Sequence, residues 1–213
     1  MARRLGLLWA VAAPVPGLLS ACSPSATYLG SASEGLYFKV PPSWHVVGRE
    51  GLGRLGLPST GGAAAAEAQG DSYFVYVGLA AGRPHLGPAG LTGGVPWALG
   101  LVQSLGSQDQ ASLSLAGLQD EVFNPDSASQ QGVPVTQLAP TEVVVRGGLR
   151  GTRVAYQIDS PDGWIAFEQE AVTNSPTDKV WAVLVGCSPA CFRDHRSVVS
   201  RIVSSFTVTG TKG

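Results

Sequence analysis

The C-terminal half of the chain constrains the fold most, because it contains four β-rich segments that are separated by strong turn signals. These segments comprise residues 142–146, 149–158, 164–173 and 179–187. Gly147 and Gly148 separate the first two, and a glycine pair readily takes the positive φ angles of a tight hairpin turn. Turn-rich sequences at residues 159–163 and 174–178 separate the others. Four consecutive strands joined by short turns predict an antiparallel meander.

The last of these segments is apolar on both faces, which is typical of a central strand that is covered on both sides. After Pro189, apolar residues recur at alternating intervals of three and four, which predicts a helix with one apolar stripe. The stripe comprises Phe192, His195, Val199, Ile202 and Phe206. We expect this helix to cover one face of the sheet, with His195 packed in the core or at its margin.

The first half of the chain has weaker patterns. We expect strands at residues 36–40, 44–47 and 72–79, a loop at 51–70, helices at 96–105 and 114–123, and an exposed segment at 124–140. The first of these helices is predicted because Trp97, Leu101 and Leu105 recur at intervals of four residues.

Residues 1–21 have the three parts of a secretory signal peptide. Arg3 and Arg4 give a positive start, and the apolar stretch at residues 5–19 is shorter than the ~20 residues that span a bilayer. Small residues precede Cys22, and the sequence Leu-Ser-Ala-Cys resembles the lipobox of bacterial lipoproteins. We therefore expect cleavage between Ala21 and Cys22. The alternative is a secreted protein whose mature end happens to contain a cysteine.

In a lipobox the cysteine sulfur receives a diacylglyceryl group, so Cys22 is the expected site of lipidation, with palmitate or similar acyl chains. Two or three acyl chains hold a protein firmly to a bilayer, whereas one holds it only marginally. The polar residues 22–34 are expected to form a flexible tether, and residues 35–210 a single domain.

Cys187 and Cys191 form the remaining pair of cysteines, and an even pair in an exported chain predicts a disulfide. In an unbroken helix this spacing would hold the Cβ atoms roughly 6 Å apart, which is too far for a disulfide. Ser188 and Pro189 favour the start of a helix between the two cysteines. We therefore expect the bridge to span the corner between a strand and a helix. A redox pair or two free thiols are the alternatives.

The formal net charge of −1 predicts no basic face for nucleic acid or anionic lipid, so no nucleic-acid partner is expected. His45 and His85 have no ligand residues at the spacing of a metal site, and neither a metal nor a cofactor is expected. Serine-hydrolase motifs and phosphate-binding loops are also missing from the sequence.

Four stretches together resemble actinobacterial lipoproteins of the Mog1/PsbP-like type. They are YFKVPPSW at 37–44, RGGLRGTRVAY at 146–156, the strand that ends at Cys187, and IVSSFTV at 202–208. The resemblance covers most of residues 35–208 and implies an α+β fold, in which an antiparallel meander sheet is sandwiched by helices. It also implies a binding or assembly module, and it transfers no catalytic residue.

Glu168 and Glu170 lie two residues apart on a predicted strand, so both point to one face, roughly 7 Å apart. That separation suits the carboxylate pair of a glycosidase. No further acid–base partner is identifiable, however, which favours a solvated strip beside Trp164. Trp164, Glu168 and Glu170 are therefore the candidate ligand-binding residues, and no catalytic residue is expected.

The sequence therefore predicts a non-catalytic binding or assembly module, anchored to the extracytoplasmic face of the cell membrane through Cys22. Its expected partners are the membrane and an envelope protein or cell-wall ligand. One alternative is a cell-wall hydrolase that uses Glu168 and Glu170. The other is a thiol redox protein that uses Cys187 and Cys191.

Overall fold

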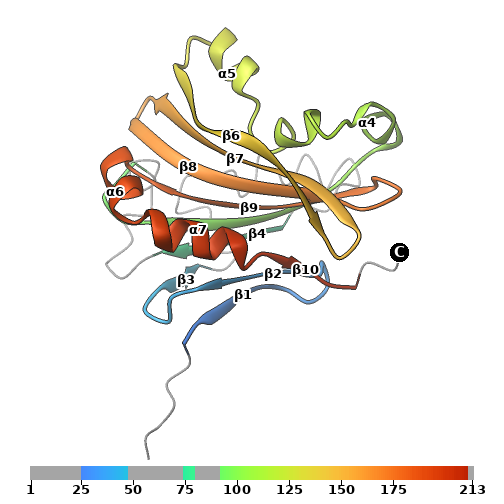
Figure 1. Ribbon diagram of the computed structural model, residues 1–213, viewed down its shortest axis with the longest axis horizontal. Helices are drawn as coiled ribbons and strands as arrows, with labels where there is room; N and C mark the ends of the chain where they lie inside the picture. The colour runs from blue at the N-terminus through green and yellow to red at the C-terminus, as the bar shows by residue number, and fades with distance from the viewer. Residues whose placement is uncertain (1–24, 48–73, 80–91, 211–213) are drawn as a thin grey trace, which may run out of the picture.

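The fold is described from a computed structural model, which covers residues 25–47, 74–79 and 92–210. Figure 1 shows its elements. The strands are β1 (Thr27–Ser31), β2 (Leu36–Val40), β3 (His45–Val47), β4 (Phe74–Leu79), β5 (Trp97–Ser104), β6 (Val135–Arg146), β7 (Leu149–Ser160), β8 (Gly163–Thr173), β9 (Lys179–Cys187) and β10 (Thr207–Val208). The helices are α4 (Ser107–Ser112), the short 3-10 helix η2 (Gly117–Gln119), α5 (Pro125–Gln130), α6 (Pro189–Asp194) and α7 (Arg196–Ser204).

The main sheet has the strand order β3-β4-β5-β9-β8-β7-β6, and every neighbouring pair is antiparallel. The predicted meander is confirmed, because β6, β7, β8 and β9 follow one another in both sequence and space. Gly147 and Gly148 form the first turn with φ angles of 53° and 88°, as the glycine pair predicted. The turn between Ser160 and Gly163 fixes the register of the next pair, in which Arg153 lies opposite Glu170.

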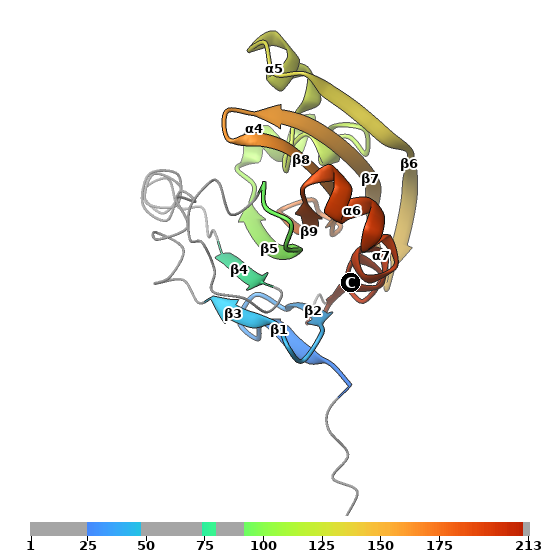
Figure 2. The same ribbon diagram turned by 90° about the vertical axis from the view of Figure 1, so that its left-hand side faces the viewer.

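Helices α6 and α7, together with a second sheet of order β1-β2-β10, cover one face of the main sheet (Figures 1 and 2). The core on this face includes Phe38 from β2, Val183 from β9 and Ile202 from α7, each 2% exposed or less. Burial of apolar surface at about 25 cal/mol per Å² makes this layer a main source of stability.

The opposite face of the main sheet is covered by the segment that carries η2, from which Leu118 inserts fully buried. Phe123 follows η2 and packs its ring against Tyr156 and Phe167, with centroids 5.4 and 5.3 Å apart. Both faces of β9 are therefore buried, as the apolar sequence of this strand predicted. The fold is α+β, an antiparallel sheet between layers that contain helices.

The prediction of a helix at residues 96–105 is wrong, because Trp97–Ser104 forms strand β5 between β4 and β9. An interval of four is also a multiple of the two-residue period of a strand, so Trp97, Leu101 and Leu105 share one face in either structure. All three are buried in the core on the η2 side. Pairing with β9 decides that this segment forms a strand and not a helix.

The prediction of a flexible tether at residues 22–34 is wrong for residues 27–31. Thr27–Ser31 forms β1, which pairs with β2. Glu34 joins the β1–β2 hairpin to the main sheet. Its side chain forms an ion pair with Lys179 at 3.0 Å, and its backbone carbonyl accepts a hydrogen bond from the indole nitrogen of Trp181 at 2.7 Å. The signal peptide, Cys22 and the loop expected at 51–70 lie outside the described residues.

The single closing helix is divided in two, with α6 ending at Asp194 and α7 beginning at Arg196. Phe192, Val199 and Ile202 are buried as expected, but His195 lies at the break and is exposed, so its expected packing is wrong. The helix expected at 114–123 is likewise reduced to η2 and turns, whereas 124–140 is mostly exposed as expected.

Candidate functional site

Two carboxylates of β8 lie beneath α7, and each is bound to an arginine. Glu170, which is completely buried, forms a bidentate ion pair with Arg146 at the end of β6. Glu168, which is 5% exposed, forms an ion pair with Arg153 of β7. A bidentate guanidinium–carboxylate pair is one of the stronger hydrogen-bonded contacts in a protein. We call Glu168 and Glu170 the paired glutamates.

The same arginines reach the last two turns of α7. Arg153 donates hydrogen bonds to the hydroxyls of Ser204 at 3.1 Å and Ser200 at 2.9 Å. Arg146 donates to the backbone carbonyl of Ser204 at 3.4 Å. The arginines therefore connect three strands of the meander to the helix that covers them.

The prediction that Glu168 and Glu170 form a solvated strip is wrong, since both side chains are buried and form ion pairs with arginines. They do lie on one face of β8, as their spacing predicted, because both reach the arginines on the α7 side. A carboxylate held by a guanidinium is stabilised in its charged form and is a poor proton donor. Both carboxylates therefore act as hydrogen-bond acceptors for the arginines.

A polar pocket of about 230 Å³ opens beside this cluster, between α7 and the middle of β6. We call it the β6 pocket. It is lined by Ala139, Pro140, Glu142, Arg153, Val154, Ala155, Glu168, Arg196 and Ser200. The pocket lies where β6 loses its regular register with β7, between Gln137 and Glu142. Pro140 has no N–H to donate to the ladder, and proline in a strand is typically found at such irregularities.

One oxygen of Glu168, Oε2, has no hydrogen-bond partner among the described residues. Glu168 lines the β6 pocket, with the exposed side chains of Glu142 and Arg196 at its rim. Arg196 also lies over the ring of Phe192, 5.4 Å from its centroid. Since a buried carboxylate oxygen without a donor is costly, the pocket is suited to a group that donates a hydrogen bond.

Trp164 is not part of this cluster. It lies near the start of β8, opposite Asp159, and is 41% exposed. Trp44, Trp97 and Trp181, in contrast, are buried in the core. The structure therefore brings Glu168 and Glu170 together and leaves Trp164 as a separate exposed aromatic residue.

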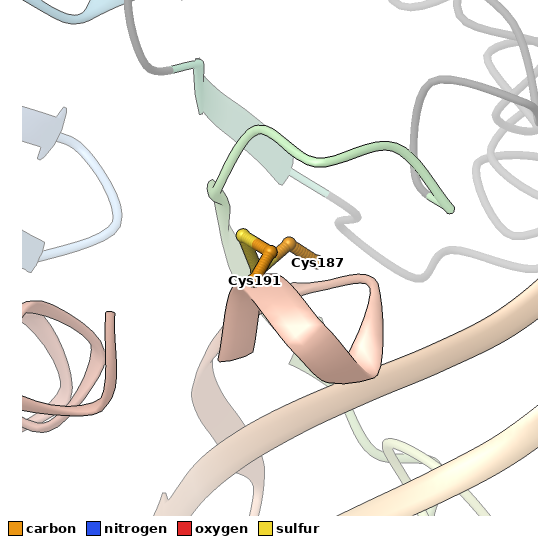
Figure 3. Close-up of a disulfide and its surroundings, with 2 residues drawn as sticks. All are labelled: Cys187 and Cys191. Carbon is orange, nitrogen blue, oxygen red and sulfur yellow. A yellow bond between two sulfur atoms is a disulfide. The ribbon is translucent and has the colours of Figure 1, made fainter. Parts of the chain in front are cut away.

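Cys187 and Cys191 form a disulfide with their Cα atoms 5.9 Å apart (Figure 3). Figure 3 shows the bridge between the end of β9 and the first turn of α6, which is the corner that the sequence predicted. Both residues are buried in the core beneath the helices. A buried bridge fits a structural role better than a redox role, which requires an accessible thiolate.

A group of carboxylates lies on the opposite side of the sheet, around η2. Burial and the charge of Asp126 raise the pKa of Asp120 above its ordinary value of 3.8, and a hydrogen bond with Gln119 partly offsets this. Burial, followed by the charges of Asp109 and Asp120, raises the pKa of Glu121 above 4.5. Neither residue is paired with a cation among the ion pairs of the described segments.

Within the segments that the structure describes, no group of three or more His, Cys, Asp or Glu side chains is arranged to hold a metal ion. Across the same segments, no helix is long and apolar enough to span a membrane.

No family model matches the sequence, and no curated protein matches it. Solved structures do resemble the chain. A cyanobacterial PsbP protein from Synechocystis sp. PCC 6803 is 14% identical, with a TM-score of 0.55 over 90% of this chain and 99% of that chain. This likeness shows the fold, which is that of the Mog1/PsbP-like proteins.

Two further structures are similar over most of their length. LpqN, a Mycobacterium tuberculosis protein involved in cell envelope biogenesis, is 13% identical, with a TM-score of 0.49 over 87% of this chain and 91% of that chain. The Ran-binding protein Mog1p of Saccharomyces cerevisiae is 12% identical, with a TM-score of 0.49 over 89% and 98%.

Sequence reasoning missed the arginine partners of the glutamates. The turn at residues 161–162 sets the register of β7 against β8, so the position of Arg153 opposite Glu170 could have been derived. Arg196 and Ser200 carried no such signal, because they reach the site only through the packing of α7 on the sheet.

The buried ion pair of Arg146 and Glu170 gives a double-mutant prediction. Arg146→Met leaves Glu170 charged and unpaired in the core, so the free energy of unfolding should fall by about 3 kcal/mol, the lower end of the usual range because the Arg146 side chain is 32% exposed. Glu170→Met should cost a similar amount. The double variant should lose clearly less than the sum of the two. Urea denaturation measures all four proteins, and strictly additive losses would contradict the pairing.

The carboxylates around η2 give a pH prediction. Since the pKa of Asp120 is raised on folding, its stabilising contribution is complete below pH 3.8 and is lost as the pH rises through the higher folded pKa. Asp120→Asn should therefore stabilise the protein at pH 7, and the gain should vanish at acid pH. Thermal unfolding at several pH values measures this. Asp162→Asn, on the exposed turn before β8, is the matched control and should show no such change. Equal effects of the two variants would contradict the prediction.

Proposed function

We propose that this protein is a lipid-anchored, non-catalytic module on the extracytoplasmic face of the cell membrane, where it binds or assembles with an envelope protein or cell-wall ligand. The observation that carries the non-catalytic part is the pairing of Glu168 and Glu170 with Arg153 and Arg146. The site of binding that we propose is the β6 pocket.

The paired glutamates support binding over hydrolysis for a physical reason. A general acid must give up its proton in the reaction, and a base must be free to accept one. Three of the four oxygens of these carboxylates instead accept hydrogen bonds from guanidinium groups that also hold α7. Their role is therefore to set the position of the helix that forms one wall of the pocket.

The β6 pocket supports a binding role because it combines a fixed floor with charged groups of both signs. Arg153 is held by Glu168 and by Ser200, so the floor is preorganised. Glu142 and Arg196 at the rim are exposed. A pocket of about 230 Å³ with such a lining suits a small polar group, such as a polar side chain of a partner or a hydroxyl-rich cell-wall fragment.

The proposed location is supported by the signal peptide and the lipobox that ends at Cys22. The disulfide between Cys187 and Cys191 is a second, independent support, because disulfides form and persist in oxidising compartments outside the cytosol. The resemblance to Mog1/PsbP-like lipoproteins implies a binding or assembly role of the same kind.

Lipid anchoring is tested at Cys22. We expect the protein isolated from its own cells to begin at Cys22 and to carry diacylglyceryl and acyl groups on that residue, as measured by intact-mass and peptide mass spectrometry. Cys22→Ala should leave the protein unlipidated and shift it out of the detergent-soluble membrane fraction. An intact signal peptide, or a free thiol at Cys22 in the native protein, would overturn the proposed location.

Binding in the β6 pocket is tested with a matched pair on α7. Ser200 lines the pocket, whereas Ser197 is exposed on the same helix and does not line it. A ligand that is crosslinked to the anchored protein in its own envelope should be retained by Ser197→Trp and lost from Ser200→Trp, with both variants checked for native thermal unfolding. A ligand that Ser200→Trp retains would place binding elsewhere. A turnover that Glu168→Gln with Glu170→Gln abolishes would overturn the non-catalytic role.

A further inference from the structure

Two adjoining hollows lie along the C-terminal half of α7, where it meets the small sheet. The first, of about 560 Å³, is lined by residues that include Ser25, Lys39, Pro42 and Arg201. The second, of about 490 Å³, includes Tyr28 and Tyr37 and shares Lys39, Ser204 and Ser205 with the first. Because they share these walls, we treat them as one surface and call it the basal groove.

The basal groove carries exposed positive charge without negative partners. Lys39 and Arg201 are both exposed, and neither forms an ion pair in the part of the chain that the structure describes. Glu168 and Glu170, which lie beneath α7, are already paired with Arg153 and Arg146. Among the described residues that line the groove, Lys39 and Arg201 are the charged ones, and both are positive.

The groove also carries an aromatic side chain suited to a membrane surface. The ammonium of Lys39 lies over the ring of Tyr28, 5.1 Å from its centroid, and Tyr28 is 65% exposed. Tyrosine is enriched at membrane–water interfaces, where its ring enters the headgroup layer and its hydroxyl stays hydrated. Lysine and arginine stems behave in the same way beside anionic headgroups.

Negative charge gathers at the other side of the molecule. Asp109 in α4, Asp120 and Glu121 after η2, and Asp126 in α5 belong to the layer that Figure 1 shows at the top, away from β1 and β2 at the bottom. Figure 2 shows the same arrangement from the side. The net charge of −1 thus hides an uneven distribution, with Lys39 and Arg201 at the basal groove and these carboxylates around η2.

The chain length between the groove and Cys22 limits how far apart the two can lie. Ser25 lines the groove and follows Cys22 by three positions in the chain. Three extended residues span at most about 10 Å. That length is similar to the screening length of charges at physiological salt, roughly 8 Å. An acyl chain on Cys22 would therefore hold the end of the groove at Ser25 close to the lipid headgroups.

From these observations we infer that the basal groove binds the headgroups of anionic phospholipids in the membrane that carries the anchor. This inference rests on the proposed function for its location. Contact through Lys39, Arg201 and Tyr28 would orient the molecule, with the carboxylates around η2 facing away from the bilayer. Each cation near an anionic bilayer contributes about fivefold to membrane affinity.

The test uses the mature chain, residues 22–213, with Cys22→Ser so that binding does not depend on the lipid. Sedimentation with vesicles of phosphatidylcholine, with or without ~30% phosphatidylglycerol, measures the affinity at ~0.1 M salt. We expect binding only to the anionic vesicles. Lys39→Ala and Arg201→Ala should each weaken it about fivefold, and the double variant about 25-fold. Arg150→Ala, which removes an exposed arginine outside the groove, is the matched control and should not change it.

Three results would overturn the inference. Equal binding to neutral and anionic vesicles would exclude headgroup charge as the cause, and an equal loss in Arg150→Ala would exclude the groove. Release by ~10 mM inorganic phosphate, beyond the effect of chloride at matched ionic strength, would indicate a site for free phosphate instead. Failure of the proposed lipid anchor is seen separately, because mass spectrometry of the native protein reports the state of Cys22.

Discussion

The pairing of two buried glutamates with two arginines organises the structure around α7. Arg146 and Arg153 come from β6 and β7, Glu168 and Glu170 from β8, and the arginines extend to Ser200 and Ser204 on the helix. Apolar packing alone would let a helix slide on a sheet, since the hydrophobic effect is not directional. Hydrogen bonds from a planar guanidinium have fixed geometry, so they determine where the helix lies. The walls of the β6 pocket and of the basal groove both depend on that position.

Much of the fold could be predicted from the sequence, because its signals are local. The glycine pair at 147–148 and the turns at 159–163 and 174–178 define the meander without any long-range information. The prediction failed at Trp97–Ser104, where an interval of four residues suits a helix and a strand equally and only pairing with β9 decides. It also failed at β1, which is stable because Glu34 joins its hairpin to the main sheet.

The candidate site was predictable only in part. The spacing of Glu168 and Glu170 placed both on one face, but it gave no indication that the face is covered by a helix. Arg153 could have been found from strand register, whereas Arg196 and Ser200 depend on how α7 packs. The distribution of charge over the surface was also not predictable from the sequence. The total over the chain is close to zero, yet the folded molecule places Lys39 and Arg201 at the basal groove and a group of carboxylates around η2.

The irregular centre of β6 has a consequence for how copies of the protein meet. In the described part of the chain β6 is the outermost strand of the main sheet, and Val143 and Val145 are 68% and 71% exposed on it. A long regular edge of this kind invites another strand to dock and extend the sheet, which leads to aggregation. Pro140 and the lost register interrupt the row of free N–H and C=O groups halfway along. The feature that opens the pocket thus also hinders copies of the protein from joining edge to edge.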